Sequence, residues 1–194
     1  NLTVSGVSPT ATGIQGRGIH VSGEVGSGAS ISMSDVVVSN VTDAGIFIRN
    51  VPMVELTNIT VENVSPVSFT GSPDPYSVPS MMVDPDLSGD GLVIVQRDPD
   101  GLPDAAERVV VNLTGTNHFS EIYRAGVIAD SSTLNLYEVP ATMEAGMDSM
   151  AGFFITQHSG ELNWLGEMEP GGTPPTSCTT TVLSVDDEDI GFDD

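Results

Sequence analysis

Residues 45 to 64 read GIFIRNVPMVELTNITVENV, and this stretch decides the fold of the chain. Apolar and polar residues alternate in three short runs rich in β-branched side chains, which favours β-strands over helix. Asn50, Asn58 and Asn63 separate the runs, and asparagine tolerates the left-handed backbone that a bend requires. One such unit cannot bury its apolar side alone. Copies of it are therefore expected on both sides.

The chain contains these copies. Gly18-Ile-His-Val21 matches Gly45-Ile-Phe-Ile48, residues 31–33 match residues 54–56, and residues 35–41 match residues 58–64. Residues 1–7 match the third strand, so the chain is expected to begin inside a coil, as a mature or excised piece of a longer protein. Later glycine-led strands are Gly91-Leu-Val-Ile94, Gly126-Val-Ile-Ala129 and Gly152-Phe-Phe-Ile155. Later second strands are expected at 109–111, 134–136 and 162–164, with a third strand at 112–117.

This pattern resembles the right-handed parallel β-helix of the pectin-lyase-like superfold, over about residues 1–165. The resemblance implies an all-β solenoid of about five coils, each with three short strands, with long inserted loops. Neighbouring coils would hydrogen-bond at a spacing of about 4.8 Å. We expect a β-helix domain at 1–168, with loop insertions at about 65–90 and 96–107, and a Pro/Gly/Thr-rich and acidic tail at 169–194. Residues 140–151 are expected to form a short helix. A leucine-rich repeat or a β-sandwich would need other spacings.

The charge of the chain limits its partners. It has 27 acidic residues, five arginines, no lysine and a net charge of −22. Such a surface repels nucleic acids and anionic membranes, and attracts cations, above all calcium. A surface that simply keeps the protein soluble is the alternative. No segment is long and apolar enough for membrane insertion. Cys178 is the only cysteine, so no internal disulfide can form. We also expect an extracellular or cell-surface location.

Two acidic clusters predict calcium binding. In the first, side-chain oxygens alternate and a glycine stands sixth, as in calcium-binding loops, but the bidentate glutamate at position twelve is missing. The second resembles the D-x-D-G-Φ-P-D element of thrombospondin type 3 repeats, which implies calcium binding. Aspartate and glycine are also ordinary turn residues, and that alternative stays open. The candidate ligands are Asp84, Asp86, Asp90, Asp98, Asp100 and Asp104.

Five N-x-Ser/Thr sequons begin at Asn1, Asn40, Asn58, Asn63 and Asn112. Glycosylation is one interpretation. The repeat offers another, in which asparagines at strand joints stack into ladders. We expect one ladder of Asn40, Asn63 and Asn117, and a second of Asp35, Asn58 and Asn112.

The middle residue of each glycine-led strand is expected to point outward. An apolar stripe on the outside of a solenoid should be covered by a loop, by the tail, or by another molecule. If open, it would serve as a lateral interface or as a surface on which sugars stack. The stripe contains His20, Phe47, Val93, Ile128 and Phe154.

Catalytic residues are harder to find. The resemblance implies clustered Asp, Arg, Lys or His on one outer sheet, but the three histidines fall at unlike positions and the arginines look scattered. Asp43 with Asp90 is the one candidate glycosidase pair, and surface turns are the alternative for both.

Three functions are therefore considered. The first is a non-catalytic, secreted structural, adhesive or assembly module, which self-associates through its ends or stripe and which calcium stabilises. The second is a polysaccharide lyase or glycoside hydrolase, and the third is a carbohydrate-binding module.

Overall fold

The computed structural model describes residues 1–8, 16–24, 26–67, 88–96, 108–138, 140–145, 153–157, 160–166 and 183–185. Within these ranges the regular structure is all β-strand. Most of the expected loop insertions, and the tail apart from residues 183–185, lie outside the described residues. The described part contains no helix, and so none that is long and apolar enough to cross a membrane.

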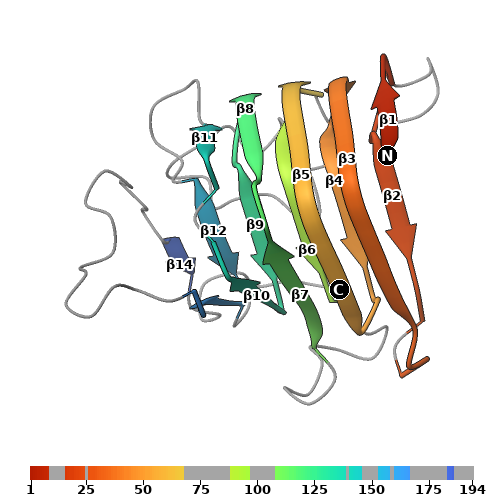
Figure 1. Cartoon of the computed structure of the whole chain (residues 1–194), viewed down its shortest axis with the longest axis vertical. Coiled ribbons are helices and arrows are strands. Elements are labelled where there is room, and N and C mark those ends of the chain that lie inside the picture. Colours follow the sequence, from red (N-terminus) through yellow and green to blue (C-terminus); the bar gives the residue numbers. More distant parts are fainter. Residues whose placement is uncertain are drawn as a thin grey trace, which may run out of the picture.

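The described strands form two parallel sheets, which we call sheet A and sheet B (Figure 1). Along its main path, sheet A contains β1 (Leu2–Ser5), β3 (Ser30–Thr42), β5 (Met53–Ser65), β7 (Val109–Thr114), β10 (Ser132–Leu136) and β13 (Glu161–Trp164). Two further strands of sheet A are β8 (His118–Ile122), beside β5, and β11 (Thr142–Ala145), beside β8. Sheet B contains β2 (Ile19–Ser22), β4 (Ala44–Arg49), β6 (Asp90–Val95), β9 (Val127–Asp130), β12 (Phe154–Gln157) and β14 (Leu183–Val185).

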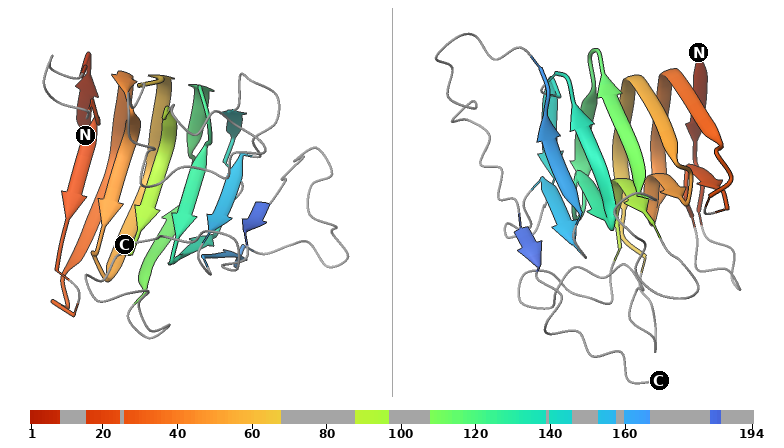
Figure 2. Two further views of the ribbon diagram at one scale, coloured as in Figure 1. Left: turned by 180° about the vertical axis from the view of Figure 1, so that it is seen from behind. Right: turned by 90° about the horizontal axis from the view of Figure 1, so that it is seen from below.

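The chain passes back and forth between the sheets. From β2 to β6 each strand lies in the opposite sheet from the strand before it, and these strands pair in parallel with their neighbours in each sheet. Sheet A lies in front in Figure 1, and sheet B in the view from behind in Figure 2. The main core lies between the sheets, where Val36 and Leu56 of sheet A pack in one cluster with Ile46 and Ile48 of sheet B.

The first three coils have the register that the sequence predicts. Leu2 pairs with Val36, Ile19 with Ile46, and Ile31 with Val54. The expected second and third strands of these coils are continuous, however, as the 13-residue strands β3 and β5. Their bends are single left-handed residues inside the strand, with φ of 53° at Asp35 and Asn40, 55° at Asn58 and 54° at Asn63. The asparagines thus bend the strands, as expected, without ending them.

Three expectations need correction. In β7, Val111 and Leu113 are the inward pair, opposite Val54 and Leu56, so the second strand lies two residues later than expected. In β12, Phe154 rather than Phe153 pairs with Val127, a shift of one residue. The expected helix at 140–151 is wrong for its first part, where β11 pairs with β8.

A row of glycines holds sheet B close to sheet A. A Cβ at Gly45 would lie 2.3 Å from Val61 Cγ1 and 2.7 Å from the Gly91 carbonyl oxygen. A Cβ at Gly18 would meet Val38 and the Gly45 carbonyl oxygen in the same way. The glycine that opens these strands is therefore required by close packing. Before β12 Phe153 takes this place, and its ring packs where a Cβ of Gly126 would lie.

Candidate functional site

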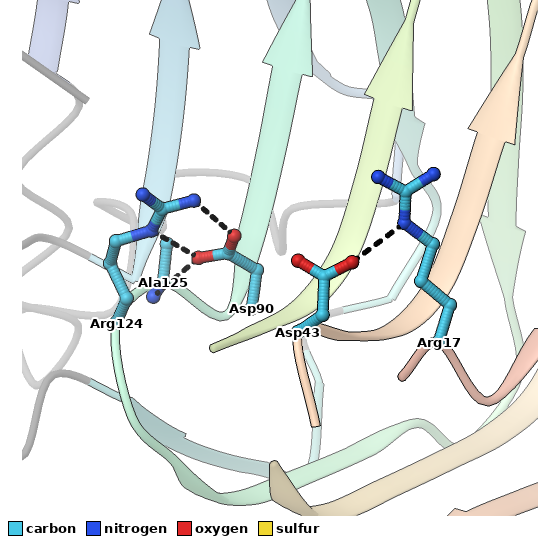
Figure 3. A network of polar contacts seen from close by, with 5 residues as sticks. All are labelled: Arg17, Asp43, Asp90, Arg124 and Ala125. Carbon is cyan, nitrogen blue, oxygen red and sulfur yellow. Dashed lines mark hydrogen bonds and ion pairs between the residues drawn. The ribbon is translucent and has the colours of Figure 1, made fainter. Parts of the chain in front are cut away.

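Four charged side chains from consecutive coils lie in one row, just before or at the start of four strands of sheet B. Arg17 precedes β2, Asp43 precedes β4, Asp90 begins β6, and Arg124 precedes β9. Figure 3 shows the two carboxylates side by side in the middle, with one guanidinium on each flank. The order along the row is Arg–Asp–Asp–Arg. It unites the two aspartates that the sequence suggested as a pair.

Asp90 and Arg124 form a buried bidentate ion pair. Arg124 Nε donates to Asp90 Oδ1 at 2.8 Å, and Arg124 Nη2 donates to Asp90 Oδ2 at 2.5 Å. The backbone N–H of Ala125 also donates to Asp90 Oδ1, at 3.3 Å. Asp90 is 2% exposed and Arg124 1% exposed. Such a pair is stable in the interior because each charge has a close, well-oriented partner.

Asp43 and Arg17 form the second pair. Arg17 Nε donates to Asp43 Oδ2 at 2.8 Å, and both side chains are mostly buried. The Arg17 guanidinium carbon also lies 3.6 Å from the centre of the Phe47 ring, a cation–π contact. His20 packs edge-on against the same ring, with the ring centres 5.0 Å apart. Partial burial, followed by the nearby charges of Arg17 and Arg49, lowers the pKa of His20.

The backbone brings the two aspartates together. The N–H groups of Gly89 and Asp90 both donate to the Asp43 carbonyl oxygen at 2.9 Å. Burial raises the pKa of the Asp43 carboxyl and the charge of Asp90 adds to this, against the opposing effects of Arg17 and the Ser88 hydroxyl. Among the described residues, Ser88 Oγ has no partner at hydrogen-bond geometry. Protonation of Asp43 is thus easier than that of an ordinary aspartate.

These contacts limit what the pair can do chemically. A glycosidase needs one carboxyl group that protonates the leaving group and a second that attacks the sugar or activates water. Here each carboxylate already accepts a hydrogen bond from an arginine, and both side chains are buried. The arrangement is typical of charges that hold neighbouring coils together. The Asp43 and Asp90 carboxylates do lie side by side, as the two carboxyl groups of a glycosidase would.

Of the six candidate calcium ligands, only Asp90 lies within the described residues. Its carboxylate oxygens both accept hydrogen bonds from Arg124, so they do not fit a calcium ligand in this conformation. Within the described part, no three His, Cys, Asp or Glu side chains are grouped so that they could hold a metal ion. The calcium prediction therefore rests on the other five aspartates. Those five are Asp84, Asp86, Asp98, Asp100 and Asp104.

The apolar stripe of sheet B is present, with one change of residue. His20, Phe47, Val93 and Ile128 lie in register on β2, β4, β6 and β9, as predicted. The fifth member is Ile155, because Phe154 pairs with Val127 and packs in the main core. Phe47 is 2% exposed, and Val93, Ile128 and Ile155 are buried with it in a second apolar cluster. These four buried side chains do not present an open surface for sugar stacking or lateral contact, and of the five residues only His20, at the β2 end, is exposed.

Two predicted ladder contacts are confirmed. Asn58 Nδ2 donates to Asp35 Oδ1 at 3.0 Å, and Asn63 Nδ2 donates to Asn40 Oδ1 at 2.8 Å. Asn117, the expected third member of the ladder with Asn40 and Asn63, does not continue it. It is fully buried, and its Oδ1 accepts the backbone N–H of Ile59 at 2.9 Å.

Asn112 belongs to a ladder that was not predicted. Its Nδ2 donates to Glu55 Oε1 at 2.6 Å, and its Oδ1 accepts from Asn135 Nδ2 at 2.8 Å. Asn163 Nδ2 continues the row to Asn135 Oδ1 at 3.1 Å. This ladder of Glu55, Asn112, Asn135 and Asn163 follows the outer face of sheet A. The repeated apolar-Asn-apolar triplets at 111–113, 134–136 and 162–164 were the sequence signal for it.

Sequence reasoning also missed the two arginines of the charged row. Arg17 stands directly before Gly18, and Arg124 two residues before Gly126. Their common place before glycine-led strands was the available signal. Comparison with models of protein families, with curated proteins and with solved structures finds no match to this chain.

Proposed function

We propose that this chain is a non-catalytic structural or assembly module, built as a right-handed parallel β-helix whose coils are joined by buried charges and side-chain ladders. The alternation of successive strands between two parallel sheets supports the β-helix. We also propose that this β-helix is similar to the pectin-lyase-like superfold. Secretion or display at a cell surface fits its acidic composition.

One observation carries this proposal. Asp43 and Asp90, the best candidates for acid–base chemistry, are both buried and each is bound by an arginine. Polar side chains on the outer face of sheet A are also joined to equivalent residues on neighbouring coils, as in the ladder from Glu55 to Asn163. The buried ion pairs and these side-chain ladders thus connect neighbouring coils. A catalytic groove would instead leave several polar groups turned toward a substrate.

Calcium is proposed as a stabilising ion through the five aspartates outside the described residues. Calcium prefers several carboxylate and carbonyl oxygens, and the sequence 84–104 provides them. A thermal unfolding series with calcium, magnesium and a chelator tests this part alone. Stabilisation by calcium beyond that by magnesium is expected. Equal effects of the two ions would indicate only screening of the net charge.

The alternative is a polysaccharide lyase or hydrolase, and one experiment separates it from a structural module. The full chain is incubated with a panel of acidic and neutral glycans, with calcium present, and the release of unsaturated or reducing ends is measured. The matched control is the Asp43→Asn variant. We expect no release above that of the control. Release by the unmodified chain that Asp43→Asn abolishes, with the fold intact, would establish the enzyme.

A further inference from the structure

The sequons of the chain differ in their surroundings. Asn1 is the first residue of the sequence, so the comparison concerns the four internal sequons. Each of these begins with an asparagine whose amide contacts a neighbouring coil of sheet A, and they are Asn40, Asn58, Asn63 and Asn112. N-glycosylation bonds a bulky sugar to the amide nitrogen of an asparagine. The surroundings of each Nδ2 atom therefore decide which of the four can carry a glycan in the folded chain.

Three of the four amide nitrogens lie against a neighbouring coil. The Nδ2 atoms of Asn58, Asn63 and Asn112 each donate to a side-chain oxygen of the coil before, at 3.0, 2.8 and 2.6 Å. Two of these amides are held on their other side as well. Asn58 Oδ1 accepts the Thr116 N–H, and Asn112 Oδ1 accepts from Asn135. A sugar on any of these three nitrogens would compete for space with a side chain at hydrogen-bond distance.

Asn40 differs because its ladder contact uses only the amide oxygen. Its Oδ1 accepts from Asn63, so its nitrogen is turned away from that residue. Within the described part of the chain, Asn40 Nδ2 donates to no acceptor. The adjacent position on β1 is Gly6, next to the paired Ser5 and Ser39, and glycine has no side chain to occupy the space. Asn40 is also exposed, at a bend of β3 where φ is 53°.

We propose that Asn40 is an N-glycosylation site and that the other three internal sequons are not modified. This goes beyond the proposed structural role and rests on the proposed secretion or cell-surface display. In the reaction, Asn40 Nδ2 bonds to C1 of an oligosaccharide carried on a lipid diphosphate. The bond from C1 to the phosphate oxygen breaks, the lipid diphosphate leaves with that electron pair, and the amide gives up one proton. Asn40 Oδ1 is unchanged, so the contact with Asn63 is kept.

The test is mass spectrometry of the full chain, which a fused leader exports through the secretory route of a host that adds N-glycans. Peptide masses locate each glycan, and among the internal sequons only Asn40 should carry one. Thr42→Val removes the sequon hydroxyl but keeps the shape of the side chain and the Asn40 amide, so this glycan should be lost. Ser65→Ala removes the Asn63 sequon in the same way and should leave the Asn40 glycan in place. Asn40→Gln replaces Thr42→Val if that variant does not fold.

Two results would overturn the inference. An exported, folded chain without a glycan on Asn40 shows that this amide is not an acceptor. Glycans on Asn58, Asn63 or Asn112 at the level found on Asn40 show that the ladder contacts do not select the site. The proposed structural role fails by a different result, the release of sugar ends in the glycan panel. The natural location of the chain is also a separate question, because the leader directs export in this experiment.

Discussion

Arg124 binds both carboxylate oxygens of Asp90, and the two residues come from neighbouring coils, 34 positions apart in the sequence. Their burial makes this pair a fixed link between β6 and the segment before β9. Arg17 and Asp43 form a similar link between the segments before β2 and β4, and Figure 3 shows the two links side by side. A pair of carboxylates that suggested catalysis in the sequence is thus part of the coil-to-coil framework.

Removal of Arg124 should be far more damaging than removal of an arginine whose carboxylate partner is exposed. Arg124→Met leaves the buried Asp90 carboxylate without its main partner and should cost about 3–5 kcal/mol of unfolding free energy. Arg108 binds Glu161 at 2.8 Å, but that glutamate side chain is 55% exposed. Arg108→Met should therefore cost about 1 kcal/mol or less. Urea unfolding of both variants makes the comparison, and equal losses would contradict the buried link.

The raised pKa of Asp43 predicts how stability depends on pH. The folded state holds the Asp43 proton up to a higher pH than the unfolded chain, where the ordinary value is 3.8. The resulting stabilisation is complete below pH 3.8 and is lost as the pH rises through the raised folded pKa. Asp43→Asn cannot titrate, so its unfolding free energy should fall less steeply over this window.

Long-range repulsion among the acidic residues also weakens the fold as the pH rises, so a control is needed. Asp35→Asn makes the same change of net charge at an exposed position. Chemical unfolding of both variants at a series of pH values isolates the local effect. If the two variants show the same slope, Asp43 does not contribute in the predicted way.

The glycine row predicts a strong effect of a single methyl group. Gly45→Ala places a Cβ 2.3 Å from Val61 Cγ1 of sheet A and 2.7 Å from the Gly91 carbonyl oxygen of the neighbouring strand, so the surrounding structure must shift. We expect a loss of about 3 kcal/mol, at the upper end for overpacking, because one clash is with backbone. At Gly26 a Cβ meets nothing within 4 Å, but φ is +72°. Gly26→Ala should cost only about 1 kcal/mol, from the backbone alone. Thermal unfolding of the two variants tests this order.

The two kinds of asparagine should also differ. Asn117 is buried and satisfies the Ile59 N–H and the carbonyl oxygens of Thr114 and Gly115. Asn117→Ala leaves these groups without a partner and should cost about 2–4 kcal/mol. Asn63 makes one exposed ladder contact, and Asn63→Ala should cost about 0.5–1 kcal/mol. If the two losses in urea unfolding are equal, the assigned role of Asn117 is wrong.

The sequence predicts the first coils well, for a physical reason. Residues 31–42 and 54–65 repeat with no insertion, so aligned positions are also paired positions in β3 and β5. In β7 and β8 this equivalence fails. Thr57 pairs with Thr114 while Thr60 pairs with His118, so one additional residue lies in the turn around Gly115–Asn117. Asn117 lies in this turn, where it is buried and accepts the Ile59 N–H, a role that sequence alignment alone does not reveal.

The site was only half predictable. Asp43 and Asp90 were paired on their positions before glycine-led strands, and the structure places them together. Their arginines were missed because side-chain reach is not part of a repeat pattern: Arg17 and Arg124 stand at different distances from their glycines. Phe154 was assigned to the stripe because Gly152 looked like the leading glycine, whereas Phe153 occupies that place.

The most direct test of a structural role for the charged row is a double-mutant cycle between Asp90 and Arg124. The unfolding free energies of the unmodified chain, Asp90→Leu, Arg124→Met and the double variant give the coupling between the two side chains. We expect a favourable coupling of about 2–3 kcal/mol, with the double variant more stable than Arg124→Met alone, because an apolar pair replaces an unpaired buried charge. A coupling near zero, with Asp90→Leu alone harmless to the fold, would contradict this account.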